Sequence, residues 1–279
     1  MTNILEAINN ICINSSLEVR SHTSARNRAN SIGDALESYI KDAFAGCIHI
    51  NDEQERNKRY SEVFSWIGNQ NHPPDIMIKE GAAIEVKKIQ NPNSDLALNS
   101  SYPKSILKVD NEMLTQACKT CETWTEKDIV YCIGHTTDNH IKSLWMVYGT
   151  IYAAEPETYQ TIKKKITQGI EQIPHVELSE TKELGRVNKV DPLGITNLRI
   201  RGMWQIQNPR KVYSYLYKSD NDYNFELVAL IPLTNYQTFP PESIQKIENN
   251  KQINITDVKV KNPNNPAKLI DCKLIILKK

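Results

Sequence analysis

Two acids and a lysine are spaced so that a short β-hairpin would bring them onto one face. Residues 72–93 are HPPDIMIKEGAAIEVKKIQNPN, with Asp75 before the turn and Glu85 and Lys87 after it. The turn sequence KEG predicts a three-residue loop whose glycine, Gly81, is in the left-handed conformation. Counting outward from this loop pairs Asp75 with Glu85, and opposed residues have Cβ atoms about 4.5–5.5 Å apart. Lys87 lies two residues further along and therefore shares that face.

Such a cluster suits metal-assisted hydrolysis of a phosphodiester. Two adjacent carboxylates repel each other, and a divalent cation with oxygen ligands removes that cost. The cation also acidifies a bound water and screens phosphate charge, while a lysine can hold that water or contact the phosphate. The alternative is a solvated hairpin face with charges placed at random, and the pattern alone does not decide. The best rival triplet, Asp271-Cys272-Lys273, lies in a strand-like run but lacks a partner acid.

Composition limits the other classes of function. The 279 residues carry a net charge of +1, so binding to nucleic acid or membrane would need a local basic patch. The N-terminus lacks the features of a signal peptide, and no apolar run approaches the ~20 residues of a membrane span. We therefore expect a cytoplasmic protein with no membrane partner. No Walker loop or GxSxG elbow occurs, which argues against a nucleotide cofactor or serine hydrolase. The pair Cys118 and Cys121 lacks the second ligand pair of a zinc site.

The remaining pattern predicts one α/β domain with additional β elements. Helices are predicted over residues 31–46, 111–124 and 156–173, the first opened by a capping box at Ser31 and ended at Gly46. Strands are predicted over residues 128–135, 143–154, 198–204, 212–218, 225–233 and 269–279, with a turn over 262–268. The helix over 31–46 carries Glu37 beside its apolar stripe.

Pro74-Asp75 followed by Glu85-Val86-Lys87 resembles the PD-(D/E)xK nuclease motif, with the Glu37 helix in the place of that superfamily's first core helix. The segments AIEVKKIQNPNSDLALNSSYPKS, LWMVYGTIYAA and ELGRVNKVDPLGITNLRIRGMW are similar to the NgoPII-type type II restriction endonucleases. This resemblance covers most of residues 30–205. It implies a restriction-endonuclease-like core, a mixed central sheet flanked by helices, with extra C-terminal β elements.

The resemblance also implies how the chain is organised and what it does. We expect a single domain over 1–279, with a catalytic core over about 30–150 and DNA recognition and β elaborations over about 180–279. The implied activity is a Mg²⁺-dependent homodimer that cuts a short palindrome, GGCC, in double-stranded DNA.

Site roles follow from the same resemblance. Asp75 and Glu85 would be metal ligands, with the Val86 carbonyl as a third, and Lys87 would be the catalytic lysine. Glu37 would be an auxiliary acid that holds metal-bound water or orients Lys87. The alternative for Glu37 is an ordinary exposed helix glutamate.

Guanine-rich targets are most often contacted by arginine or lysine at O6 and N7. Arg199 and Arg201 alternate along a strand, so their guanidinium groups should point the same way. A near-neutral protein needs its basic groups gathered in one place to meet DNA. The other candidate DNA contacts are Arg186, Asn188 and Lys189, and, in the loop after the hairpin, Asn99, Ser100, Ser101 and Lys104. The alternatives are a solvated strand face and a plain surface loop.

Two other functions fit the same residues. A repair or structure-specific PD-(D/E)xK nuclease would cut without a fixed sequence. A non-catalytic DNA-binding protein would carry a decayed site, although the intact Asp75, Glu85 and Lys87 argue against decay.

Overall fold

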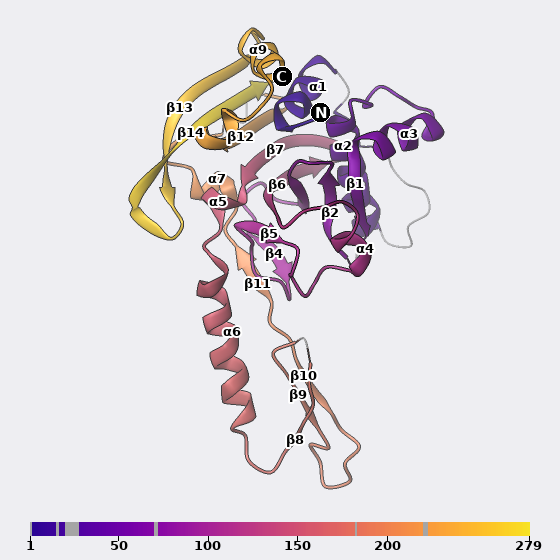
Figure 1. The fold of residues 1–279 in the computed structure, drawn as a ribbon, viewed down its shortest axis with the longest axis vertical. Helices are drawn as coiled ribbons and strands as arrows, with labels where there is room; N and C mark the ends of the chain where they lie inside the picture. Colours follow the sequence, from indigo (N-terminus) through magenta and orange to yellow (C-terminus); the bar gives the residue numbers. More distant parts are fainter. Residues whose placement is uncertain (1, 15–16, 20–27, 70–71, 182, 220–222) are drawn as a thin grey trace.

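The computed structural model describes the chain except residues 1, 15–16, 20–27, 70–71, 182 and 220–222 (Figure 1). Within these residues, nine strands form one mixed sheet. Eight of them lie in the order β1 (Phe64–Asn69), β2 (His72–Ile78), β3 (Ala83–Ile89), β6 (Glu126–Thr137), β7 (His140–Tyr148), β12 (Glu226–Pro232), β14 (Asn265–Lys278) and β13 (Ile253–Asn262). The ninth, β5 (Ile106–Lys108), pairs with β6. The β3–β6 and β7–β12 pairs are parallel, and the others are antiparallel.

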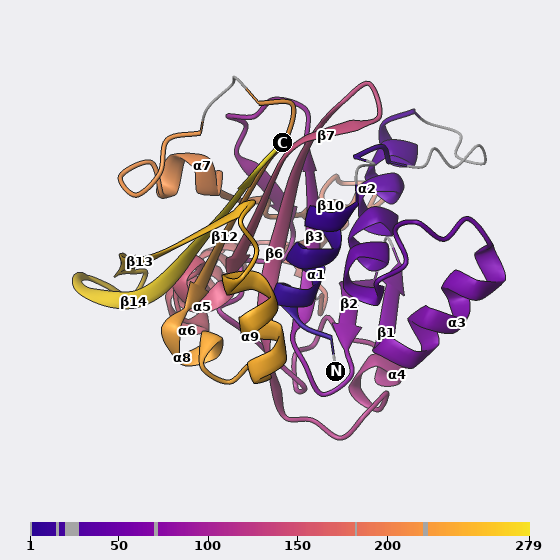
Figure 2. The ribbon, with the colours of Figure 1, turned by 90° about the horizontal axis from the view of Figure 1, so that it is seen from above.

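Helices cover both faces of this sheet. On one face lie α1 (Ile4–Ile13), α2 (Arg28–Ala45) and α9 (Pro241–Glu248), and on the other lie α5 (Gly149–Tyr152) and α7 (Pro209–Val212) (Figure 2). The central strand β12 is buried at all seven positions, which explains its continuous apolar sequence. Of two further helices, α3 (Glu53–Val63) contacts the edge strand β1, and α8 (Leu233–Tyr236) follows β12 and contacts β12 and β14. The predicted mixed sheet flanked by helices, with added C-terminal strands, is confirmed.

Most predicted strands are present, and the differences have local causes. Residues 143–154 form β7 only as far as Tyr148, and the short helix α5 follows. A Cβ at Gly149 would lie 2.4 Å from the Ser105 carbonyl oxygen, so the chain approaches that loop closely and leaves the sheet there. The strand predicted over 212–218 is wrong. This segment completes α7 and turns, because Asn208 caps that helix by accepting the Arg210 N–H at 2.9 Å.

The predicted helices also differ at their ends. The helix α2 ends at Ala45, and Gly46 follows with φ +70°, as expected for a left-handed stop. The capping box at Ser31 is wrong, because α2 begins three residues earlier, at Arg28. The helix predicted over 111–124 shrinks to α4 (Gln116–Lys119). Thr115 caps the start of α4 by accepting the Cys118 N–H. Before it, the Asn111 side chain accepts the Met113 N–H, which favours a turn over a longer helix.

An arm made of residues 156–203 extends away from the sheet (Figure 1). It contains α6 (Pro156–Glu171), close to its predicted bounds, and a small sheet of β8 (Glu177–Leu178), β9 (Gly185–Asn188) and β10 (Leu198–Ile200). The chain returns through β11 (Trp204–Ile206), which pairs with β4 (Leu96–Asn99). Among the described residues of the arm, only Gly185 and Val187 are buried. The arm therefore has almost no core of its own.

Across the described residues, no helix combines the length and apolar character needed to cross a bilayer.

Candidate active site and nucleic-acid interface

The β2–β3 hairpin has the predicted register. Ile76 faces Ile84, and the Ile78 N–H donates to the Ala82 carbonyl at 3.0 Å. The left-handed residue of the loop is Glu80, with φ 54°, so the prediction of a left-handed Gly81 is wrong. Gly81 serves a steric purpose instead, because a Cβ there would lie 2.8 Å from the Ile78 side chain.

The two strands separate where the catalytic candidates begin. The paired ladder ends at Ile76, so Asp75 joins the facing strand through its side chain rather than its backbone. Its Oδ2 atom accepts the Val86 N–H at 2.6 Å. On the other side, a Cβ at Gly68 of β1 would lie 2.3 Å from the Pro74 carbonyl oxygen, so the backbones of β1 and β2 are in close contact. Asp75 is thereby fixed between its two neighbouring strands.

Asp75, Glu85 and Lys87 form one half-buried cluster. The Lys87 Nζ atom lies 2.5 Å from Glu85 Oε1, with side-chain exposures of 27% and 18%. Burial, and next the charge of Glu85, raise the pKa of Asp75 to about 8. Burial lowers the pKa of Lys87, but the carboxylates of Glu85 and Asp75 outweigh it, so this pKa is raised overall. A carboxyl that resists ionisation beside a second acid calls for a further positive charge.

Helix α2 brings Glu37 within electrostatic reach of this cluster. Its charge raises the pKa of both Asp75 and Lys87. Its own ion pair is with Lys41, one turn further along the helix, at 3.0 Å. The position therefore agrees with an auxiliary acid, although the Glu37 carboxylate bonds to Lys41 here.

Tyr131 places a second lysine beside the cluster. Tyr131 is the β6 partner of Glu85, and its hydroxyl accepts the Lys104 N–H at 2.7 Å and donates to the Lys104 carbonyl at 3.1 Å. The Lys104 Nζ atom donates to the Ser101 hydroxyl at 2.5 Å. Burial lowers the pKa of Lys104, and Lys87 lowers it further against the opposing effect of Glu85. Lys104, predicted as a DNA contact, thus lies close to the acids.

An aromatic cluster connects the loop that carries Lys104 to the base of the arm. Tyr102 stacks on Tyr159 of α6 with ring centroids 5.3 Å apart, and both rings meet the Trp204 ring edge-on. Trp204 also pairs with Asn99, whose φ is +52°. The candidate loop over 99–104 and both ends of the arm are therefore held together. Sequence reasoning missed Tyr131 and this cluster, because the contacts join segments far apart in the chain.

The arm gathers its candidate arginines on one face of its small sheet. A Cβ at Gly185 would lie 3.0 Å from Ile170 of α6, so the next residue, Arg186, points away from that helix. Arg186 faces Arg199 across the β9–β10 pair. The predicted common direction of Arg199 and Arg201 agrees with their shared partner, Glu183, whose carboxylate both contact.

Glu183 fixes the orientation of these guanidinium groups. Arg199 donates from Nε at 3.1 Å and from Nη2 at 2.8 Å, while Arg201 Nε lies 2.6 Å from the same carboxylate. Two arginines share one acid, so the group keeps a positive charge. Two other candidates also have partners, since Lys189 pairs with Glu177 at 2.8 Å and Asn188 donates to the Ser179 hydroxyl.

The other candidate sites lack the features of an active site. Asp271 is 61% exposed and pairs with Lys259 on the long β13–β14 hairpin, as an ordinary solvated ion pair would. Burial raises the pKa of the Cys118 thiol to about 11, which suits an inert thiol. Among the described residues, no group of three or more His, Cys, Asp or Glu side chains could hold a metal. A metal at Asp75 and Glu85 would therefore need backbone, water or substrate oxygens as well.

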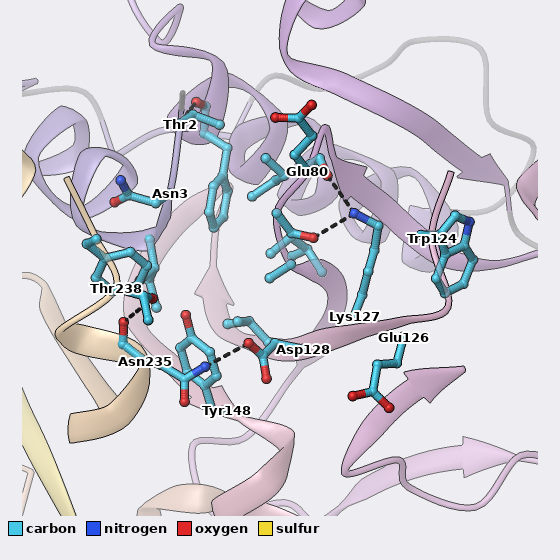
Figure 3. A pocket seen from close by; sticks show the side chains of 18 of the residues that line it. Thr2, Asn3, Glu80, Trp124, Glu126, Lys127, Asp128, Tyr148, Asn235 and Thr238 are labelled. Carbon is cyan, nitrogen blue, oxygen red and sulfur yellow. Dashed lines mark hydrogen bonds between the residues drawn. The ribbon is translucent and has the colours of Figure 1, made fainter. Parts of the chain in front are cut away.

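A cavity of about 510 Å³ lies at the turn of the β2–β3 hairpin, at the other end from Asp75 and Glu85 (Figure 3). It reaches Ile84, which points to the other face of the sheet from Glu85. Lys127 donates to the carbonyls of Ile78 and Gly81 at 3.1 and 2.8 Å, as the dashed lines show. Because this lysine is committed to the hairpin backbone, we interpret the cavity as part of the support of the hairpin.

The mixed sheet with its flanking helices is a restriction-endonuclease-like fold, and the cluster of two acids and a lysine suits phosphodiester hydrolysis. The family model described as "NgoPII restriction endonuclease" matches residues 2–261. The Type II restriction enzyme NgoPII of Neisseria gonorrhoeae is 48% identical over 275 residues, which cover 98% of each chain. The chain belongs to the NgoPII restriction endonuclease family. No solved structure matches it.

The chain is accordingly a type II restriction enzyme, a site-specific hydrolase that binds double-stranded DNA. Enzymes of this type generally need a divalent metal.

Proposed function

We propose that this enzyme is a Mg²⁺-dependent homodimer of the PD-(D/E)xK superfamily, which acts in the cytoplasm and cuts both strands of a short palindrome. The target implied by the resemblance is GGCC. The observation that carries the catalytic part is the half-buried cluster at the open end of the hairpin, where Asp75 resists ionisation beside Glu85. A dimer matches the two-fold symmetry of a palindrome, with one active site for each strand.

The donor atoms of the cluster fit magnesium. Mg²⁺ prefers oxygen ligands and is usually held by one or two carboxylates together with water and substrate phosphate. Asp75 and Glu85 would supply the carboxylates. The carbonyl of Val86 is directed toward the same strand as its N–H, which Asp75 accepts. When bound, the metal supplies an acidified water and screening of the phosphate charge.

The remaining side chains would position the substrate. Lys87 keeps its proton and stays close to Glu85, so its ammonium group can contact the scissile phosphate or the attacking water. Glu37 adds negative charge at a distance and strengthens the hold on Lys87. Lys104 is held by Tyr131 on the same face and would contact the neighbouring backbone phosphate.

Sequence recognition would come from the arm and from the loop at its base. We assign contacts to base edges to Arg199 and Arg201, whose guanidinium groups Glu183 holds in fixed directions. Arg186, Asn188 and Lys189 would meet DNA from the same part of the arm. Asn99, Ser100 and Ser101 would meet bases or phosphates beside the active site.

Digestion of a plasmid of known sequence with magnesium, followed by sequencing of the ends, tests the reaction and the target together. Asp75→Ala and Glu85→Ala should each abolish cleavage and leave the protein folded, as judged by circular dichroism. Asp271→Ala is the matched control and should cut normally. Near-normal cleavage by Asp75→Ala or Glu85→Ala would move the active site elsewhere.

Light scattering of the DNA complex tests assembly. We expect two protomers on each duplex and cleavage of both strands. A single protomer on each duplex, or nicked product that persists, would contradict the dimer.

A further inference from the structure

The tip of the arm exposes two large aliphatic side chains. The tip loop, defined here as residues 189–197, joins β9 to β10. Leu193 is 81% exposed and Ile195 is 76% exposed, more than any other large hydrophobic residue among those the structure describes. Single exposed aliphatic residues are common, but two neighbours at the end of a projecting arm suggest a contact surface.

The tip loop is built to hold these side chains in place. The Asp191 carboxylate accepts backbone N–H groups from Leu193 at 2.9 Å and Thr196 at 2.6 Å, and the Val190 N–H donates to the Thr196 carbonyl at 2.9 Å. Gly194 supplies the left-handed turn between the two aliphatic residues, with φ +69°. The loop therefore turns its polar groups inward and presents its apolar side chains outward.

Charge around the tip loop favours DNA as the occupant. Between Glu183 and Met203 the chain has four basic residues, Arg186, Lys189, Arg199 and Arg201, against two acids, Glu183 and Asp191. Among the residues that the structure describes, only Lys189 of the four has an acid of its own, Glu177 of β8. Asp191 is engaged in the loop itself, and Glu183 is shared by two arginines. A second copy of the arm would bring the same positive groups together, whereas the backbone of a duplex complements them.

We propose that the tip loop is a wedge that inserts Leu193 and Ile195 between neighbouring base pairs of the bound duplex. The inference rests on the proposed contact of the arm with DNA and adds the way in which the arm deforms its target. Leucine and isoleucine are among the side chains that unstack base steps in this manner. The energy needed to deform a step depends on its sequence, so the wedge contributes to specificity without hydrogen bonds to bases.

Unwinding of a closed circular plasmid tests the proposal. All proteins carry Glu85→Ala so that the plasmid stays intact. The plasmid is relaxed by a metal-independent topoisomerase in the presence of each protein, and its linking number is measured after the protein is removed. The test variant is Leu193→Ser with Ile195→Ser, and the matched control is Ile13→Ser, which changes an exposed residue (68%) at the end of α1, outside the arm.

We expect the Glu85→Ala parent and the Ile13→Ser control to shift the linking number, and the double variant to lose this shift at equal occupancy of DNA. Loss of the aliphatic contacts should also weaken binding about tenfold or more. Equal melting temperatures would show that all variants are folded.

Other outcomes would overturn the proposal. One is a parent that binds the plasmid without changing its linking number, and another is a double variant that unwinds it as the parent does. A smaller mass for the double variant in light scattering without DNA would assign the tip loop to a protein interface instead. A parent that binds no DNA would overturn both this proposal and the DNA contact of the arm.

Discussion

Replacing Asp75 with asparagine should stabilise the metal-free protein, because folding disfavours the ionised form that this carboxyl group has in the unfolded chain at pH 7. Burial and the charge of Glu85 raise its pKa from 3.8 to about 8. A carboxyl group with a raised folded-state pKa binds its proton more tightly in the folded than in the unfolded chain. Its contribution to stability is therefore fully present below pH 3.8 and is lost as the pH rises to about 8.

The size of the effect follows from this shift. One unit of pKa corresponds to about 1.4 kcal/mol, so at pH 7 the loss approaches ~4 kcal/mol, and relaxation or water entry reduces it to about 2–4 kcal/mol. Asparagine keeps the volume of Asp75 and an oxygen that can accept the Val86 N–H. We expect Asp75→Asn to melt roughly 5–15 °C higher than the wild-type protein at pH 7 in EDTA.

Differential scanning fluorimetry in EDTA between pH 5 and 9 measures this difference. The difference in the free energy of unfolding between Asp75→Asn and wild type should be about 1–2 kcal/mol at pH 5, should increase up to pH 8 and should stay constant above it. The difference in melting temperature should follow the same course. Asp271→Asn is the control, since its exposed ion pair with Lys259 is worth about 1 kcal/mol or less. The reasoning would be refuted if Asp75→Asn and wild type melted at the same temperature at pH 7 and 8, or if the difference between them increased as the pH fell.

Two further predictions concern the lysine and the arginines. Lys87→Ala should abolish cleavage but bind Mg²⁺ in calorimetry, because both carboxylates remain, and loss of metal binding would reveal a structural role for Lys87. Arg199→Ala and Arg201→Ala are compared by their loss of binding to the cognate site and to single-base variants of it. Loss of a base contact weakens mainly cognate binding, whereas loss of a phosphate contact weakens binding to all sequences. At least one should lose cognate binding by far more than non-cognate binding, about 1–3 kcal/mol, with an unchanged salt slope. Equal losses on all sequences, with salt slopes flatter by about one unit each, would indicate a phosphate clamp.

The features that the sequence predicted correctly are local ones. The hairpin register depends on one short turn, and the residues opposed beyond it, Ile76 and Ile84, are both buried. The end of α2 depends on one glycine, Gly46, whose positive φ marks the stop. The prediction for Gly81 was wrong because glycine occurs both where φ is positive and where neighbouring atoms leave no room for a Cβ. The sequence does not tell which of these two reasons applies, and at Gly81 it is the second.

What the sequence could not supply depends on contacts between distant segments. Residues 212–218 have a tyrosine at every second position, as a strand would, but Tyr213 instead stacks on Trp145 and donates to the Ile151 carbonyl at 2.8 Å. The position of Lys104 beside the acids depends on Tyr131, 27 residues away. The sharing of Glu183 between Arg199 and Arg201 likewise appears only once β9 and β10 are paired.

The arm lies between β7 and β12 in the chain, and these two strands are parallel neighbours in the sheet. The arm is therefore an excursion within a single crossover connection, and the neighbouring strands pair without any residue of the arm. Lengthening such a connection costs little free energy, since closure entropy rises only slowly with loop length. Evolution can thus exchange or extend the arm while the catalytic hairpin and sheet stay as they are. Under the proposed role of the arm in recognition, replacement of residues 156–203 should change the cleavage site and leave the nuclease core as it is.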